Sequence, residues 1–589
     1  MMCSSDRCMT LKPLEGEPQG WVGAGGDLVL RSATDTLSLA QCGGAFYQIA
    51  VVAEKPPGGW FCIFGPPTTV EALLDPQLAR ARRLERLHEL LARVQRGRGL
   101  ERLGELGAAV ALRWDAHRGE LSVRRDMFGR VPLVVAVERG ASGGRGAGPA
   151  VSTRPALLHP WREPSRVLWS WETFASANDA PLREDFWPGV ERIFPGEERR
   201  WRAGSWRSVA RPWRDGAVER AKRAPQSPDS ERFAQLLARS CRAVEREPGL
   251  VYTLSGGLDS STLVALARDG RSSAVRSASM VSARHPGFDE RGGIEAMVQR
   301  WRTRHRYVDI GDPDLWTPQS ANPDVEDWGP VLIWEAPYMR HFFREIRGQA
   351  SEHARTLVFG FGADQLLFSA WPHYLELAAG RASVAELRRM LGGAFARRDL
   401  RESVRILGSR VGLLPLWRAC CRPAEDPRHQ VIEGWKWEAS MRAFERYRRS
   451  TGVRLAFPFL ERELWKEMLA RTPLELRWGA GPKANLRQIL HHRAPDCVTF
   501  APKSGLFDEV VAQGMLRLFG PGGVGTLAEA PAAISPVSAE HLRRTRAWLR
   551  AGAPADRPYE AAIARYATSF EAWLANVRAL DDDLTSPGT

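Results

Sequence analysis

The amino-acid sequence predicts a two-domain α/β protein, in which strand-rich residues precede a doubly wound parallel sheet. The chain has 589 residues, more than a single hydrophobic core commonly organises. Short strand-like runs dominate the region from residue 58 to residue 206. Beyond residue 231, strand-like and helix-like runs alternate, which is typical of a parallel sheet covered by helices on both faces.

The amino-terminal part divides into three segments by composition. Residues 1–57 form a Gly-rich, weakly patterned extension of uncertain structure. Residues 58–210 form the first domain, with the strand-like runs WFCIFG, AAVALRWD, ELSVRRD and VPLVVAVE. Residues 211–230 are polar, charged and contain proline, which indicates an interdomain linker.

The second domain is expected to span residues 231–589. A helix with Phe233, Leu237 and Cys241 on one face opens it. Strands are expected at 250–254, 274–282, 306–310 and near 356, with helices after Asp259 and over 289–301. From about residue 370 the pattern is mostly helical and rich in arginine. In such a sheet, ligands bind outside the carboxyl ends of the strands.

Composition restricts the function classes. Lys and Arg exceed Asp and Glu by 14, but the arginines are spread along the chain and no nucleic-acid-binding signature is present. The eight cysteines form no CxxC pair, the first residues lack the apolar core of a signal peptide, and no run of 18 apolar residues occurs. We therefore expect a reduced, cytoplasmic protein that binds neither nucleic acid nor membrane.

The stretch SGGLDSS, residues 255–261, lies between the first strand and the following helix. Gly256 and Gly257 allow a sharp turn and a close approach to a ligand. The serine hydroxyls and the amide groups of the helix N-terminus favour an anion such as phosphate. Asp259 fits an anion site when a cation such as Mg²⁺ bridges it to the phosphates. The alternative is an ordinary Ser/Gly turn capped by an aspartate.

SGGLDSS, followed about a hundred residues later by GFGADQLL, resembles the synthetase half of class B asparagine synthetases. That superfamily also contains β-lactam synthetases and the macrolactam-forming cyclases of lasso peptides. The resemblance implies an ATP-pyrophosphatase domain that uses ATP and Mg²⁺, preceded by a glutaminase-like, Ntn-type αββα domain. It implies Asp259 and Asp364 as metal ligands. The residues implied to bind ATP are Leu254, Ser255, Gly256, Gly257, Asp259, Ser260, Met280 and Gly360.

Further segments match the family in order along the chain, from about residue 58 to residue 515. GVRLAFPFLERELWKEML resembles the Pro-Phe-Leu-Asp segment, and GPKANLRQIL and APKSGLFDEV supply Lys483 and Lys503. The resemblance implies that these two lysines are catalytic, because a cation near the phosphates stabilises charge on pyrophosphate and on the tetrahedral intermediate. Alternatives are core packing for Met280, helix capping for the aspartates and solvation for the lysines.

Departures from the family pattern restrict the class of substrate that the protein is expected to use. The family-like CIFG places Cys62 behind 61 residues, whereas a glutaminase uses an amino-terminal Cys, and residues 1–150 contain no Asn for the oxyanion hole. We therefore interpret the first domain as a degenerate glutaminase. Phe361 stands where asparagine synthetases have Glu and β-lactam synthetases have Tyr. Glu438 and Glu445 precede AFPFLE but fall out of register with a family general base, so we expect a charged helix face.

The sequence most resembles lasso peptide cyclases, in its length, its Arg/Trp-rich helical insertion at 375–450 and its AFPFLE segment. The expected reaction adenylates a side-chain carboxylate of a ribosomal precursor peptide, and the peptide α-amine then closes a macrolactam. A leader-binding protein and a leader peptidase of the same pathway are further expected partners. The alternatives are a glutamine-hydrolysing asparagine synthetase, a β-lactam synthetase-like enzyme and a non-catalytic scaffold.

Overall fold

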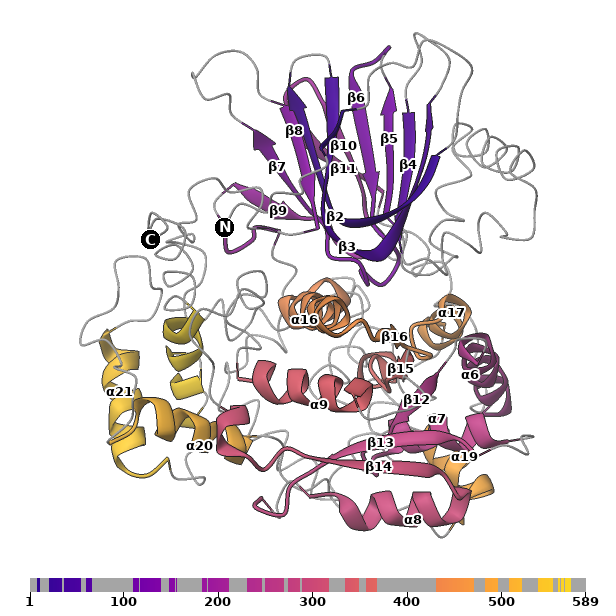
Figure 1. Ribbon diagram of the computed structural model, residues 1–589, viewed down its shortest axis with the longest axis vertical. Helices are drawn as coiled ribbons and strands as arrows, with labels where there is room; N and C mark the ends of the chain where they lie inside the picture. Colours follow the sequence, from indigo (N-terminus) through magenta and orange to yellow (C-terminus); the bar gives the residue numbers. More distant parts are fainter. Residues whose placement is uncertain are drawn as a thin grey trace, which may run out of the picture.

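The computed structural model describes two sheets with their flanking helices (Figure 1). The described residues are 8–10, 21–33, 36–53, 60–65, 110–138, 148–155, 183–210, 230–245, 249–269, 274–316, 334–348, 356–367, 431–470, 483–495, 508–521 and 539–573, with gaps of a few residues inside some of these ranges. Among the helices in these ranges, none is long and apolar enough to cross a membrane.

The amino-terminal part is one antiparallel sheet of eleven strands. Its main path runs β11-β10-β6-β5-β4-β3-β2-β8-β7-β9, and β1 pairs with β3. The strands are β1 (Cys8–Thr10), β2 (Trp21–Ala33), β3 (Thr36–Ala53), β4 (Trp60–Gly65), β5 (Val110–Asp115), β6 (Glu120–Arg124), β7 (Val134–Glu138), β8 (Gly148–Ser152), β9 (Val190–Arg192), β10 (Glu198–Arg202) and β11 (Ser205–Ala210).

Two long strands of this sheet lie within the segment expected to be an extension. β2 and β3 pair with each other over most of their length, and β3 pairs with β4 from Gln48 to Ala53. The sheet therefore begins before residue 58. The Gly-rich composition of this segment did not predict strands, because they form through pairing with residues that are distant in the sequence. The αββα arrangement stays a prediction, because residues 66–109 and 156–182 lie outside the described residues.

The second sheet has five parallel strands in the order β14-β13-β12-β15-β16. They are β12 (Leu250–Thr253), β13 (Arg276–Val281), β14 (Arg304–Asp309), β15 (Thr356–Val358) and β16 (Arg454–Ala456). This confirms the predicted parallel sheet. Successive strands extend it from β12 in one direction and from β15 in the other, so the switch in winding direction falls between these two strands. Ligands of such sheets bind at this switch point.

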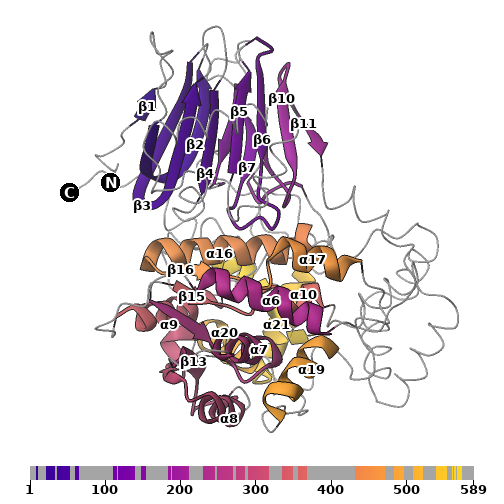
Figure 2. The ribbon, with the colours of Figure 1, turned by 90° about the vertical axis from the view of Figure 1, so that its right-hand side faces the viewer.

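Helices cover both faces of the parallel sheet (Figures 1 and 2). They are α6 (Ser230–Val244), α7 (Leu258–Arg268), α8 (Arg291–Trp301), α9 (Ala336–Gly348), α16 (Trp435–Thr451), α17 (Arg462–Leu469), α19 (Ala484–Arg493), α20 (Asp508–Phe519) and α21 (Ala539–Arg550), with a 3₁₀ turn at Pro313–Trp316. The predicted helices at 233–241, after Asp259 and at 289–301 are thereby confirmed. Most of the insertion expected at 375–450 precedes α16 and lies outside the described residues.

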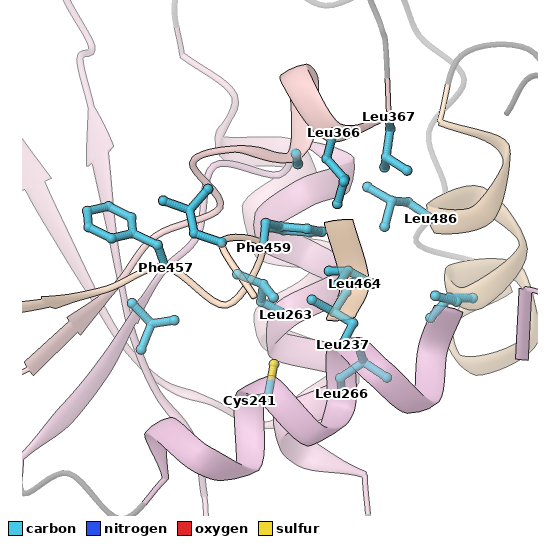
Figure 3. Close-up of a cluster of buried hydrophobic side chains, with 14 of the residues drawn as sticks. Leu237, Cys241, Leu263, Leu266, Leu366, Leu367, Phe457, Phe459, Leu464 and Leu486 are labelled. Carbon is cyan, nitrogen blue, oxygen red and sulfur yellow. The ribbon is translucent and has the colours of Figure 1, made fainter. Parts of the chain in front are cut away.

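Alternate residues of the strands point into two separate hydrophobic cores. Val251 and Leu357 belong to the core beneath α9, α16 and α21, whereas their neighbours Tyr252 and Val358 belong to the core beneath α6, α7 and α17. Figure 3 shows part of the second core, where Leu237 and Cys241 of α6 meet Leu263 of α7. Burial on both faces is the reason why these strands lack a polar alternation.

Helix α16 lies between the two sheets in both views (Figures 1 and 2). Its Tyr447 belongs to one core and its Trp437 to the other. Residues of the amino-terminal part, among them Phe128 and Trp187, are buried in the same two cores. The two parts therefore share hydrophobic cores through α16.

Candidate active site

Two loops meet at the switch point of the parallel sheet. One follows β12 and leads into α7, and the other follows β15 and leads into the four-residue helix α10 (Ala363–Leu366). Thr253 Oγ1 donates to Val358 O at 2.9 Å and so ties the ends of the two strands together. Because both strands point the same way, SGGLDSS and GFGADQ are placed side by side.

Glycines let the two loops approach each other and the neighbouring helix. Gly256 has a φ of +70°, and a Cβ there would lie 3.1 Å from the backbone nitrogen of Ile294 in α8. A Cβ at Gly360 would lie 3.0 Å from Asp259 Cβ. A side chain at either position would separate the loops or strain the backbone.

Serine hydroxyls hold the first loop in the shape of an anion site. Ser260 Oγ accepts from the amide of Ser255 at 3.0 Å and lies 3.1 Å from Ser255 Oγ. Gly257 is the N-cap of α7 and offers no side chain to its first turn. The first-turn amide groups of a helix have no intrahelical partners and favour a negative charge. The loop thus has the donors that the sequence predicted for a phosphate.

Lys483 joins the two acidic residues. Its Nζ donates to both carboxylate oxygens of Asp259, at 2.7 and 2.6 Å, and lies 2.6 Å from Asp364 Oδ1. Lys483 is the N-cap of α19 and has a left-handed backbone, with φ of 57° and ψ of 42°. This conformation is uncommon for a residue other than glycine and often occurs at functional sites. The structure therefore brings together three residues, the first and last of which are 224 positions apart in the sequence.

The pKa of Lys483 is raised above its ordinary value of 10.5. Burial by itself lowers the pKa of this ammonium group, but the charges of Asp259 and Asp364, and their hydrogen bonds, outweigh the effect of burial. Paired with these two carboxylates, Lys483 is a cation at neutral pH and acts as an electrostatic donor.

The donor set fits a divalent cation bound together with phosphates. Three carboxylate oxygens from Asp259 and Asp364 converge on one position, which the structure shows by their common contact with a single ammonium nitrogen. Mg²⁺ is commonly bound by one or two carboxylates plus substrate phosphates rather than by an all-protein cage. No group of three or more His, Cys, Asp or Glu side chains suited to a metal occurs in the part of the chain that the structure describes.

Phe361 makes the second loop apolar on the side that faces α16. Its ring centroid lies 4.9 Å from that of Trp437, 5.2 Å from that of Phe444 and 5.9 Å from that of Phe457. Such spacings are those of favourable aromatic pairs. Three residues further on, Asp364 is 59 % exposed at its side chain. The loop therefore has a hydrophobic anchor and an acidic, accessible end.

The remaining predicted site residues differ in their surroundings. Leu254 is buried, its amide donates to Ala278 O at 2.9 Å, and its carbonyl accepts from Ser279 Oγ. Met280 is partly buried and packs against the core beneath α9, in keeping with the core-packing alternative. The nucleotide contacts of both residues stay predictions. Lys503 lies outside the described residues.

Glu438 and Glu445 do not form a solvated charged face, and that expectation is wrong. Glu438 accepts from Arg125 Nη1 at 2.7 Å and from Arg442 Nε at 3.0 Å. Glu445 is paired with Arg448 at 2.7 Å, and both carboxylates are buried. The motif VRRDMFGR contains one partner, but neither spacing nor charge indicated that its Arg125 pairs with a residue 313 positions away.

A doubly wound sheet, with a Ser/Gly loop, two carboxylates and a lysine at its switch point, defines an α/β domain equipped to bind a nucleotide. Residues 232–520 match the family described as asparagine synthase. This match supports an asparagine synthetase-like domain and an ATP-dependent, amide-bond-forming synthetase activity in general. Enzymes of this family use ATP, usually with Mg²⁺. A comparison with curated proteins found no match.

Proposed function

We propose that the protein is a peptide macrolactam synthetase of the lasso cyclase type. It would adenylate an Asp or Glu side chain of a ribosomal precursor peptide and join that carboxyl group to the α-amine of the same peptide. The observation that carries the proposal is the convergence of Asp259, Asp364 and Lys483 beside the SGGLDSS loop. ATP with Mg²⁺ and the peptide are the proposed substrates, and a leader-binding protein and a leader peptidase are the proposed partners.

In the first step, a carboxylate oxygen of the peptide attacks the α-phosphorus of ATP, and pyrophosphate leaves. The SGGLDSS loop and the first turn of α7 would hold the phosphates. Asp259 and Asp364 would hold Mg²⁺, which when bound neutralises charge on the phosphates. Lys483 would stabilise the charge that develops on the departing pyrophosphate.

In the second step, the peptide α-amine attacks the acyl carbon, the amide bond forms, and AMP leaves with the carboxylate oxygen. The amine gives up its proton. Phe361 has no group that could accept this proton or bind an ammonium by hydrogen bonding. Holding the amine and the acyl group together in one molecule would supply the proximity that drives ring closure.

Support for an internal amine comes from the first domain. Cys62, the residue of the family-like CIFG, lies inside strand β4, paired on one side with Val51 and on the other with Leu112. A thiol nucleophile activated by its own free α-amine needs a chain terminus, which a residue within a paired strand does not provide. Residues 1–150 also contain no Asn. With no ammonia from glutamine, the nitrogen would come from the substrate.

The test combines pyrophosphate release with mass spectrometry on candidate peptides that begin at the cleaved α-amine. We expect ATP-dependent pyrophosphate and AMP release and a product that has lost one water. A peptide whose α-amine is acetylated should still permit formation of the acyl-adenylate but not of the ring. Pyrophosphate release without any cyclic product from peptides that carry a free amine, across a set with Asp or Glu at different positions, would contradict the proposal.

The second candidate is a glutamine-hydrolysing asparagine synthetase, because the family that matches residues 232–520 is described as asparagine synthase. It predicts asparagine formation from aspartate, glutamine and ATP. A β-lactam synthetase-like enzyme would instead close a small ring in a modified amino acid. A non-catalytic scaffold would release no pyrophosphate with any of these substrates. Pyrophosphate release, asparagine formation and the mass of the peptide product therefore distinguish these alternatives.

A further inference from the structure

The turn formed by Arg125–Val131, here called the interdomain turn, is built to present side chains across the domain boundary. Asp126 Oδ1 accepts from the amides of Phe128 and Arg130, each at 3.1 Å. Gly129 has a φ of +64°, and a Cβ there would lie 2.9 Å from the Arg125 guanidinium. The turn is therefore fixed by its own hydrogen bonds and by a glycine that no other residue replaces without strain.

The interdomain turn holds two elements of the synthetase domain. Arg130 Nη2 donates to Leu460 O in the AFPFLE segment, and its guanidinium lies over the Phe128 ring at 5.5 Å. The carbonyl of Phe128 accepts from Trp437 Nε1 of α16 at 2.8 Å. One short turn thus fixes both the segment after β16 and helix α16.

Both of these elements pack against the loop that carries Asp364. Leu460 lies so close to Gly362 that a Cβ on that glycine would be 2.5 Å from Leu460 Cδ2. Trp437 packs on Phe361, with ring centroids 4.9 Å apart. Asp364 itself is largely exposed, lies in the first turn of a helix of only four residues, and pairs with Lys483. Its position therefore depends on this ion pair and on what supports the loop, rather than on burial of its own side chain.

From this chain of contacts we propose that Arg130 is a positioning residue for the acidic loop at residues 359–364. The amino-terminal domain then has a role in the synthetase reaction that does not require glutamine hydrolysis. This inference rests on the proposed function only in taking Asp364 as a ligand of the ATP-bound metal. Residues that orient metal ligands from outside commonly change metal affinity or activity by about 10- to 100-fold when they are removed.

The experiment compares Arg130→Ala, Arg130→Lys and Arg199→Ala in the full chain. Arg199 is a buried cation of the same domain that pairs with Glu191 at 2.5 Å and so provides a matched control. We expect Arg130→Ala to bind ATP·Mg²⁺ about 10- to 100-fold more weakly by calorimetry. Arg130→Lys should recover most of the affinity, because it keeps the charge and one donor. Arg199→Ala should bind as the unmodified protein does.

Hydrogen exchange supplies a readout that does not need the nucleotide. In Arg130→Ala, amide exchange should become faster at 359–364, while 254–260, which the interdomain turn does not back, should keep its protection. If Arg130→Ala folds poorly, Trp437→Phe removes the bond to Phe128 O and reduces the ring that packs on Phe361, and it should show the same selective pattern.

Three outcomes would overturn the inference: unchanged exchange at 359–364 in both variants, equal loosening of both loops, or an equal loss of ATP·Mg²⁺ affinity in Arg199→Ala. Absence of ATP·Mg²⁺ binding by the unmodified protein would instead overturn the proposed function. In that case, selective exchange at 359–364 would still establish the support of the loop.

Discussion

Replacing Glu438 by Gln should destabilise the folded protein by about 3 kcal/mol at neutral pH. Burial alone would raise the pKa of Glu438, but the guanidinium groups of Arg125, Arg442 and Arg192 outweigh burial and lower this pKa from 4.5 to about 2. At 1.36 kcal/mol per pKa unit, the difference corresponds to about 3 kcal/mol of favourable interaction with the ionised form. Glu438 is only 1 % exposed, so solvent screens this interaction little.

The lowered pKa determines the pH range in which Glu438 stabilises the folded protein. A carboxylate whose pKa is lower in the folded state contributes stability that is complete above its unfolded-state pKa, near 4.5, and that is lost as the pH falls through about 2. The free energy of unfolding, measured by urea titration with tryptophan fluorescence, should therefore differ most between the unmodified protein and Glu438→Gln at pH 7. The difference should shrink between about pH 4.5 and pH 2.

Glu445→Gln is the matched control on the same helix. Glu445 is also buried, and it pairs with Arg448, three residues away on the same helix. Glu445→Gln should cost less stability, because an ion pair within one helix turn contributes less than a carboxylate shared by several guanidinium groups across the domain boundary. A loss below about 1 kcal/mol for Glu438→Gln, or a loss of constant size from pH 7 to pH 2, would refute the electrostatic reasoning.

Three further predictions concern the site. Asp364→Asn should keep the fold but abolish pyrophosphate release, since a neutral amide does not offset Mg²⁺ charge between phosphates; turnover within about tenfold of the unmodified protein would remove Asp364 from the site. Gly362→Ala should cost about 1–3 kcal/mol in unfolding experiments and impair adenylation, because φ is +95° there and the added methyl group meets Leu460; unchanged stability and activity would contradict this. Lys503→Ala should bind ATP·Mg²⁺ normally by calorimetry but lose macrocyclisation by about a hundred- to a thousandfold, and a parallel loss of ATP binding would make Lys503 a nucleotide ligand instead.

Local chemistry made the parallel sheet and the position of the site predictable. Each of the acidic motifs follows a short apolar strand, and parallel strands bring their carboxyl ends to one edge. Gly256 and Gly360 marked the places where backbone approaches backbone. The family resemblance implied a catalytic Lys483 near the phosphates, but its contact with both carboxylates was not predicted, because no local pattern near residue 483 indicates a partner 224 positions away.

The strands of the first 57 residues and the charges at the domain boundary were not predictable from local pattern. β2 contains four glycines or alanines in its first half, and its pairing with β3 rather than its residue types makes it a strand. In the sequence, Glu438 is typical of a solvated residue on an arginine-rich helix. The sequence around it does not indicate that it pairs with Arg125 of the amino-terminal part. Burial and pairing of this kind depend on the tertiary structure, and no local sequence pattern indicates them.

The ion network at the boundary also bears on the orientation of α16. Arg442 Nη2 contacts Asp185 Oδ2 at 2.5 Å and its Nε contacts Glu438, which in turn accepts from Arg125. Buried ion pairs often give no net gain over hydrophobic residues of similar size, because desolvation offsets their attraction. Their directional bonds, however, restrict the rotation of α16 about its axis. Trp437 is the neighbour of Glu438 in this helix and packs on Phe361, so the same helix connects the ion network with the acidic loop.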